Sequence, residues 1–172
     1  MKLVCTLAFV LAVSMPAGAQ NANPFTQAAK GQYDLVKGNI VKAAEKVGEE
    51  HYAFKPSPDV RTFGQIVAHI ADANHMICSR ATGGTAPTTS IEKTVTARAD
   101  LQKALNESFA ACDAAFASMN DQKGAEMVKF FGGEQPRLSV LQFNTAHDFE
   151  HYGNLVTYMR IKGIVPPSSE GK

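Results

Sequence analysis

Apolar residues recur every three or four positions along four long stretches of the chain, the spacing of one face of an α-helix. These stretches run from about residue 24 to 50, 62 to 80, 96 to 119 and 139 to 162. We find no strand pattern that competes with them. The pattern therefore predicts an all-α fold, a four-helix bundle.

The predicted helix ends carry recognisable local signals. Thr62 suits an N-cap, and Ser139 with Gln142 has the spacing of a capping box for the fourth helix. Gly163 suits the C-terminal cap of that helix, and the prolines that follow prevent its continuation. The segment 131–136, rich in glycine and proline, is expected as a break before the fourth helix.

The connection between the second and third helices is long enough to cross over. About 15 residues span roughly 45 Å when extended, and a helix of about 20 residues is roughly 30 Å long. The connection can therefore return along the bundle and leave these two helices parallel. Parallel helices would place Cys78 and Cys112 at the same end, whereas antiparallel helices would separate them by roughly 25–30 Å. A disulfide would support the crossover, and free thiols far apart would favour a simple up-and-down bundle; the alternative to a disulfide is two buried free thiols.

Residues 1–19 have the features of a secretory signal peptide. Lys2 precedes an apolar run over residues 3–13, and Ala17-Gly18-Ala19 is a small-residue cleavage site. The run is too short to span a bilayer, and the alternative is a buried N-terminal helix. We expect an exported protein, periplasmic or secreted and cleaved after Ala19. Its compartment would permit a disulfide.

The remaining chain is long enough for one domain, expected over residues 20–167, with a mobile tail over 168–172. The chain has 17 Lys and Arg against 16 Asp and Glu, and without Lys2 the two signs are equal. A neutral domain with no basic cluster is a poor candidate for nucleic acid or an anionic membrane. No later segment is apolar enough to be inserted in a membrane. The sequence leaves a small-molecule substrate as the partner, of unknown identity.

Histidines stand where aliphatic residues would ordinarily fill the fourth helix. Its inward stripe consists of Val140, Asn144, His147, His151, Leu155 and Tyr158. Buried polar groups cost free energy unless they find partners, so the pair is either a metal site, a hydrogen-bonded core pair or an exposed face. His69 borders the inward stripe of the second helix. Three imidazoles would leave a coordination position open, as catalytic metal sites do. His51 and His75 are interpreted as non-ligands.

Two other metal motifs fit the letters of the sequence. Residues 147–151 match the H-x-x-E-H pattern of inverted zinc proteases, but only Glu170 follows as a further acidic ligand. Asp72 with His75, and Asp148 with His151, resemble the Glu-x-x-His pairs of di-iron bundles, with the shorter aspartate in place of glutamate.

Two segments resemble the histidine motifs of the DinB-like family. They are RTFGQIVAHIAD, over residues 61–72, and NTAHDFEHYGNL, over residues 144–155. The ending YMRIKGIVPP, over residues 158–167, is similar to a common ending in that family. The resemblance covers essentially the whole chain after the signal peptide, and the two motifs in this order are fairly specific.

The resemblance implies a four-helix bundle with the long crossover and one divalent metal ion, zinc or nickel. Carried over residue by residue, the ligands are His69, His147 and His151. Characterised relatives include transferases and isomerases that use bacillithiol or mycothiol, and relatives are often homodimers. An export signal departs from those enzymes, because low-molecular-weight thiols are mainly cytosolic.

We therefore expect a metal-dependent hydrolase or transferase that acts through a metal-bound water or thiolate. Asn144 and Tyr158 are candidate pocket residues, and Asp72 and Glu150 are candidate partners for the ring N–H groups of the ligands. The catalytic residues are unknown, since no general base is evident. The competing function is a bundle that binds metal for structure or sequestration and has no catalytic role.

Overall fold

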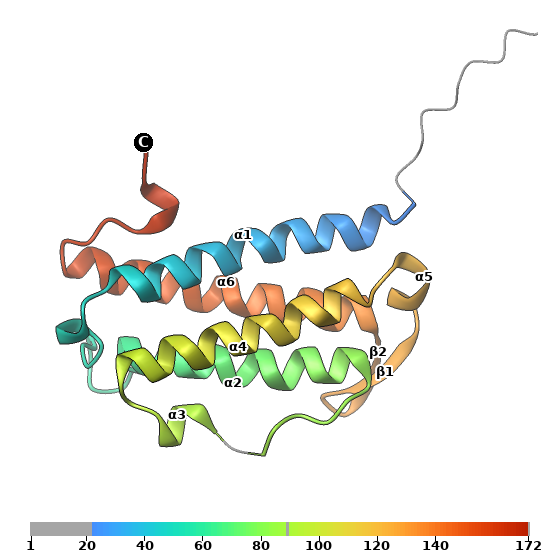
Figure 1. Ribbon diagram of the computed structural model, residues 1–172, viewed down its shortest axis with the longest axis horizontal. Helices are drawn as coiled ribbons and strands as arrows, with labels where there is room; N and C mark the ends of the chain where they lie inside the picture. The colour runs from blue at the N-terminus through green and yellow to red at the C-terminus, as the bar shows by residue number, and fades with distance from the viewer. Residues whose placement is uncertain (1–21, 89, 172) are drawn as a thin grey trace, which may run out of the picture.

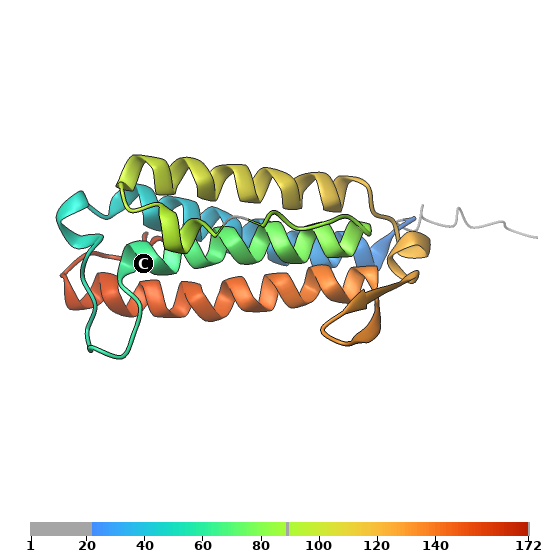
Figure 2. The ribbon, with the colours of Figure 1, turned by 90° about the horizontal axis from the view of Figure 1, so that it is seen from below.

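The computed structural model describes residues 22–88 and 90–171 and shows an all-α fold built on four long helices. The predicted signal peptide lies outside the described residues. Figures 1 and 2 show the long helices packed side by side. They are α1 (Pro24–Lys46), α2 (Phe63–Thr82), α4 (Arg98–Ala117) and α6 (Arg137–Ile161). None of the described helices is long and apolar enough to cross a membrane.

Helices α2 and α4 are parallel, as the loop length predicted. Gly64 lies against Leu101 near their starts, and a disulfide joins Cys78 and Cys112 near their ends, with 5.2 Å between the Cα atoms. The crossover between them carries a short helix, α3 (Ile91–Thr94), and runs back along the bundle (Figure 1).

The remaining helices run in the opposite direction. The backbone N–H of Thr26, at the start of α1, donates to Asp121, just beyond the end of α4. The guanidinium of Arg98, at the start of α4, donates to the carbonyl of Glu45, near the end of α1. The guanidinium of Arg137, at the start of α6, donates to the carbonyl of Ala81, near the end of α2. The α2–α6 pair is therefore antiparallel, which sets residues near 69 on α2 opposite residues near 147 on α6.

The core between the four helices is aliphatic and aromatic, and its largest members are fully buried. They include Tyr33, Ile40, Ile70, Ile77, Leu105, Phe109, Leu141 and Leu155. Thr62 caps α2 as predicted, and its capping box is completed by Gln65, whose side chain accepts from the backbone N–H of Thr62. The side chains that the periodicity assigned to the interior of α2 are all buried.

The expected start of the fourth helix was wrong. Helix α6 begins at Arg137 after Pro136, without a side-chain cap, so Ser139 and Gln142 form no capping box. The residues before it form a hairpin of β1 (Met127–Phe130) and β2 (Gly133–Pro136), and a short helix, α5 (Asp121–Gly124), precedes it. The hairpin was missed because strands of four residues, one of them exposed at three of its four positions, carry little apolar alternation.

The end of the first helix, expected near residue 50, also differs from expectation. Helix α1 ends at Lys46, because Val47 is extended, and a 3₁₀ turn (η1, Glu49–His51) follows. The tail after residue 167, expected to be mobile, forms a second 3₁₀ turn (η2, Pro167–Ser169). The Tyr152 hydroxyl donates to the Ser168 hydroxyl, and Glu170 pairs with Lys46 at 2.6 Å. These polar contacts join the tail to α6 and α1.

Candidate metal centre

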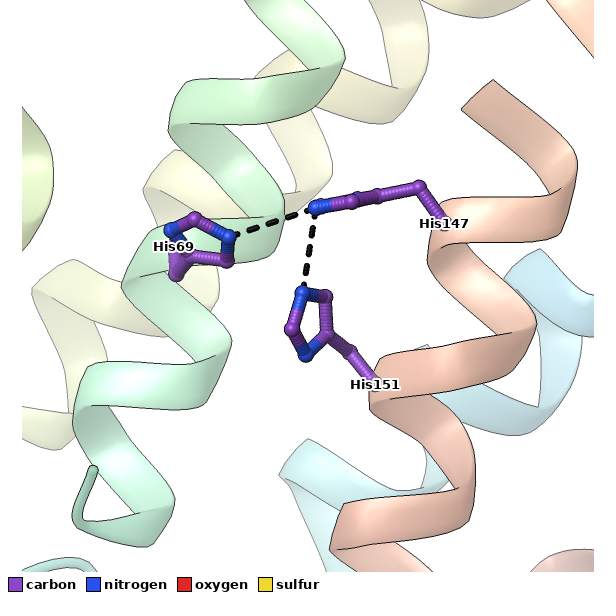
Figure 3. Close-up of side chains that lie close together, drawn as sticks. All are labelled: His69, His147 and His151. Atoms are coloured by element: carbon purple, nitrogen blue, oxygen red, sulfur yellow. Dashed lines mark hydrogen bonds between the residues drawn. The ribbon is translucent and has the colours of Figure 1, made fainter. Parts of the chain in front are cut away.

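Three histidines from two helices converge on one point. His69 reaches from α2 toward His147 and His151, which lie one turn apart on α6 (Figure 3). The Nε2 atom of His147 is 3.2 Å from that of His69 and 3.0 Å from that of His151. All three candidate ligand atoms lie within 4.8 Å of one another. The antiparallel packing of α2 and α6 brings His69 to the predicted pair.

The spacing of these nitrogens fits a shared transition-metal ion. With metal–nitrogen bonds of about 2.1 Å, two ligands lie roughly 3.0 Å apart at an octahedral angle and about 3.4 Å apart at a tetrahedral one. The two short distances fall in that range, and three imidazoles suit zinc and nickel alike. A neutral ring nitrogen carries either one N–H or one lone pair, so Nε2 of His147 cannot form a separate, well-directed hydrogen bond to each neighbouring Nε2, whereas a shared cation accommodates all three.

Burial keeps two of the rings neutral. It lowers the pKa of His151 to about 4, with smaller contributions from His147 and His69 beside it. Burial also lowers the pKa of His147, and the neighbouring His69 adds to the effect. At neutral pH both rings therefore offer a lone pair instead of a positive charge, which is the state that a metal ion requires.

Glu92, on α3, contacts the ring nitrogen of His69 that does not face His147. Its Oε2 lies 3.2 Å from Nδ1 of His69, and its Oε1 accepts from Nε of Arg61 at 2.8 Å. A carboxylate on the far nitrogen of a ligand fixes the tautomer that presents Nε2 to the metal. The side chain of Asn154 lies 3.4 Å from Nδ1 of His151. Nδ1 of His147 has no partner among the described residues.

Sequence reasoning did not find Glu92, because it lies in the crossover, 23 residues from His69. Asp72 was a candidate partner of a ligand ring; it lines the cavity beside His69 and His147, but its hydrogen bonds go elsewhere. Its carboxylate accepts from the Ser90 hydroxyl and from the backbone N–H groups of Ile91 and Glu92. Asp72 thus anchors α3 to α2, and α3 in turn carries the carboxylate that contacts the site.

The other three candidates have different surroundings. Glu150 is exposed, and in the described chain no hydrogen bond joins it to a ligand ring. Tyr158 lines a cavity with His151, as expected, and its hydroxyl donates to the carbonyl of Arg61 at 2.9 Å. Asn144 is fully buried away from the cavities, so its placement in a pocket was wrong.

Asn144 belongs to a buried polar cluster below the histidines. Its amide donates to Oδ1 of Asn74, 2.7 Å away, and to Oδ2 of Asp148, 3.2 Å away. The side-chain amide of Asn74 donates in turn to the Ser108 hydroxyl. Asp148 is wholly buried, and burial raises its pKa well above the ordinary value. The core therefore favours the neutral form of a carboxyl group that lies next to His147 in sequence.

The three histidines lie between two cavities. His69 and His147 line one of about 680 Å³, whose other walls are mostly apolar. His151 lines another of about 640 Å³, together with Arg61 and Tyr158. Solvent and small molecules can therefore approach the histidines from two sides, which leaves room for a ligand that the protein does not supply.

Comparison with known proteins identifies the family. The model of the DinB superfamily matches residues 32–155, most of the chain and all three histidines. The chain belongs to the DinB superfamily. It is 26% identical over 122 residues to the uncharacterized protein YjoA of Bacillus subtilis strain 168, a match over 70% of this chain and 79% of YjoA.

Solved structures of DinB-like proteins share the fold. A DinB-like protein from Bacillus cereus ATCC 10987 superposes with a TM-score of 0.70 at 18% identity, over 82% of this chain and 95% of that one. A mycothiol-dependent maleylpyruvate isomerase superposes with a TM-score of 0.61 at 15% identity, over 76% of this chain and 60% of the isomerase. The family, predicted from the two histidine motifs, and the all-α fold, predicted from the apolar periodicity, are thereby confirmed.

Proposed function

We propose that this protein is a metal-dependent hydrolase or transferase whose single divalent metal ion is held by His69, His147 and His151. The observation that carries the proposal is the convergence of three Nε2 atoms between two cavities. A closed structural site would supply a fourth protein ligand, and the described residues offer none within the same distance.

A divalent metal ion bound there would lower the pKa of a coordinated water toward neutrality, or would bind a substrate thiolate. The chain's own residues prepare the site for either. Glu92 fixes the orientation of His69, and Arg61 holds Glu92 in place. A fold relative named for its dependence on mycothiol supports the thiolate alternative. An exported location, where such thiols are scarce, favours water.

The metal content of purified protein tests the proposal. Wild-type protein is expected to carry one zinc or nickel ion per chain after dialysis, and His69→Ala, His147→Ala and His151→Ala are expected to lose it. His51→Ala is the matched control, because His51 lies on η1 and outside the cluster. Equal metal in all five proteins would overturn the proposal.

A second measurement separates catalysis from a purely structural role of the metal. The core and the disulfide already hold the four helices together, so chelation is expected to lower the melting temperature only modestly. Collapse of the helical circular dichroism signal on chelation would favour the structural alternative.

We also propose that the protein is exported, with cleavage after Ala19. The order of charge, apolar run and cleavage site supports this, as does a disulfide between buried cysteines. N-terminal sequencing of protein from the native host's secreted or periplasmic fraction should begin at Gln20. An intact Met1 start in the cytosolic fraction would contradict export.

A further inference from the structure

An apolar cavity opens beside His69 and His147. Its volume of about 680 Å³ is within the usual range for small-molecule sites. Its apolar walls include Ala73, Met76, Ile77, Ile91, Phe131 and Phe143. A cavity of this composition next to a polar cluster suits a ligand with an apolar body and one polar end.

Phe131 projects at the rim of this cavity from a strained turn. It has a φ of 44° and the next residue, Gly132, a φ of 81°, as in a two-residue type I′ hairpin turn. A bulky side chain at this φ is disfavoured, and asparagine or glycine would fit without strain. The side chain is 71% exposed, so burial in the core does not repay the strain. Strained residues of this kind tend to gather at ligand-binding sites.

A second aromatic ring continues the wall toward the histidines. Phe143 lies one helical turn before His147 on α6, and 44% of it is exposed. The ring centroids of Phe131 and Phe143 are 5.7 Å apart, with an interplanar angle of 76°. Both rings thus present apolar surface to the cavity, and Phe143 lines it beside the candidate metal ligand His147.

The charges of the cavity restrict what can enter. The charged residues among its described walls are Asp72, already engaged by α3, and Glu107. Lys55 and Arg61 line the other cavity instead. The apolar cavity therefore suits an uncharged ring better than an anionic one.

We propose that the apolar cavity binds an uncharged aromatic group of a small substrate whose metal-binding group lies at the three histidines, with Phe131 and Phe143 as specificity-determining residues. The part of this proposal that concerns the metal-binding group rests on the proposed function, and the part that concerns the aromatic group rests on the cavity itself. The substrate class is thus a small aromatic molecule that carries an oxygen or sulfur ligand for the metal.

The first arm of the test uses Co²⁺-loaded protein and two hydroxamates. Benzohydroxamate and acetohydroxamate share the metal-binding group, and the first carries a phenyl ring where the second carries a methyl group. Binding is followed in the visible spectrum of Co²⁺. We expect wild type to prefer benzohydroxamate by about tenfold or more, as burial of a phenyl ring predicts. Phe131→Asn and Phe143→Ala should reduce this preference at least threefold. Equal affinities of wild type for the two compounds would overturn the proposal.

The variants are chosen to keep the fold. Phe131→Asn creates an Asn-Gly turn, which suits the type I′ hairpin better than the native residue. Phe25→Asn is the matched control, because Phe25 is 72% exposed and lies on α1, outside the cavity. The control should retain the wild-type preference.

The second arm needs no metal and so distinguishes the two proposals. N-phenyl-1-naphthylamine, a neutral aromatic fluorophore, is titrated into metal-free protein. Binding that weakens at least threefold in Phe131→Asn and Phe143→Ala but not in Phe25→Asn supports the aromatic cavity, even if no metal binds and the proposed function fails. Unchanged dye binding in both cavity variants would overturn the cavity proposal, whatever the metal content.

Discussion

The disulfide between Cys78 and Cys112 makes a prediction with a calculable size. Replacement of both residues by alanine removes a covalent link that closes a loop of 34 residues between two parallel helices. The chain-entropy relation assigns such a loop about 3.8 kcal/mol of stabilisation at 25 °C. Both sulfurs are buried, so the two small cavities left by alanine would add to the loss.

Equilibrium unfolding in urea measures the effect. With an m-value of about 2 kcal/mol/M, a loss of about 3.8 kcal/mol moves the midpoint down by roughly 2 M. Wild-type protein unfolded in excess dithiothreitol retains both sulfur atoms and lacks only the link. The difference between the reduced wild type and Cys78→Ala/Cys112→Ala then isolates the packing contribution of the sulfurs.

The site should survive the loss of the disulfide. His69 is nine residues before Cys78 on α2, about 13 Å along the helix axis, so metal content should be unchanged in reduced protein well below its midpoint. A reduced wild type that unfolds at the same urea concentration as the oxidised protein would refute the argument. It would mean that the core alone fixes α2 against α4.

Three further outcomes are expected. Glu92→Gln should weaken metal affinity about 10- to 100-fold in chelator competition. Glu150→Gln should leave it unchanged, because of these two glutamates Glu92 is the one that contacts a ligand ring. Asp148→Asn should stabilise the protein increasingly between pH 4 and 8 in urea titrations. Burial raises the folded-state pKa of Asp148 above the ordinary 3.8, so the stability this group contributes is full below that value and is lost as pH rises; an advantage that shrinks with pH would contradict this. Tyr158→Phe should cost about 1 kcal/mol in the same assay through the lost bond to the Arg61 carbonyl, and no change would show that bond to be dispensable.

The long helices were predictable because the spacing of apolar residues that marks a buried helix face is a local property of the sequence. Thr62 is an example, since its N-cap with the Gln65 partner marks where α2 begins. The β1–β2 hairpin was not predictable in the same way. Its turn places Phe131 at a positive φ, against the residue's own preference, so its local signal was weak.

The candidate site also combines a part that the sequence predicted and a part that the packing of helices decided. The sequence alone placed His147 and His151 one turn apart on a helix, because the spacing of the α-helix decides which side chains share a face. Their meeting with His69 needed the antiparallel packing of α2 and α6, which no local pattern encodes.

The surroundings of the histidines were decided by the tertiary structure alone. Glu92 contacts His69 because the crossover folds back over α2 and Asp72 anchors it there. Phe131 reaches the apolar cavity only because a short hairpin precedes α6. The sequence by itself determined the long helices and the pairing of His147 with His151, since these depend on spacing within one segment, and two motifs together indicated the family. Contacts between distant segments depend on how the whole core packs, and this decided the partners of the histidines and the shape of the space beside them.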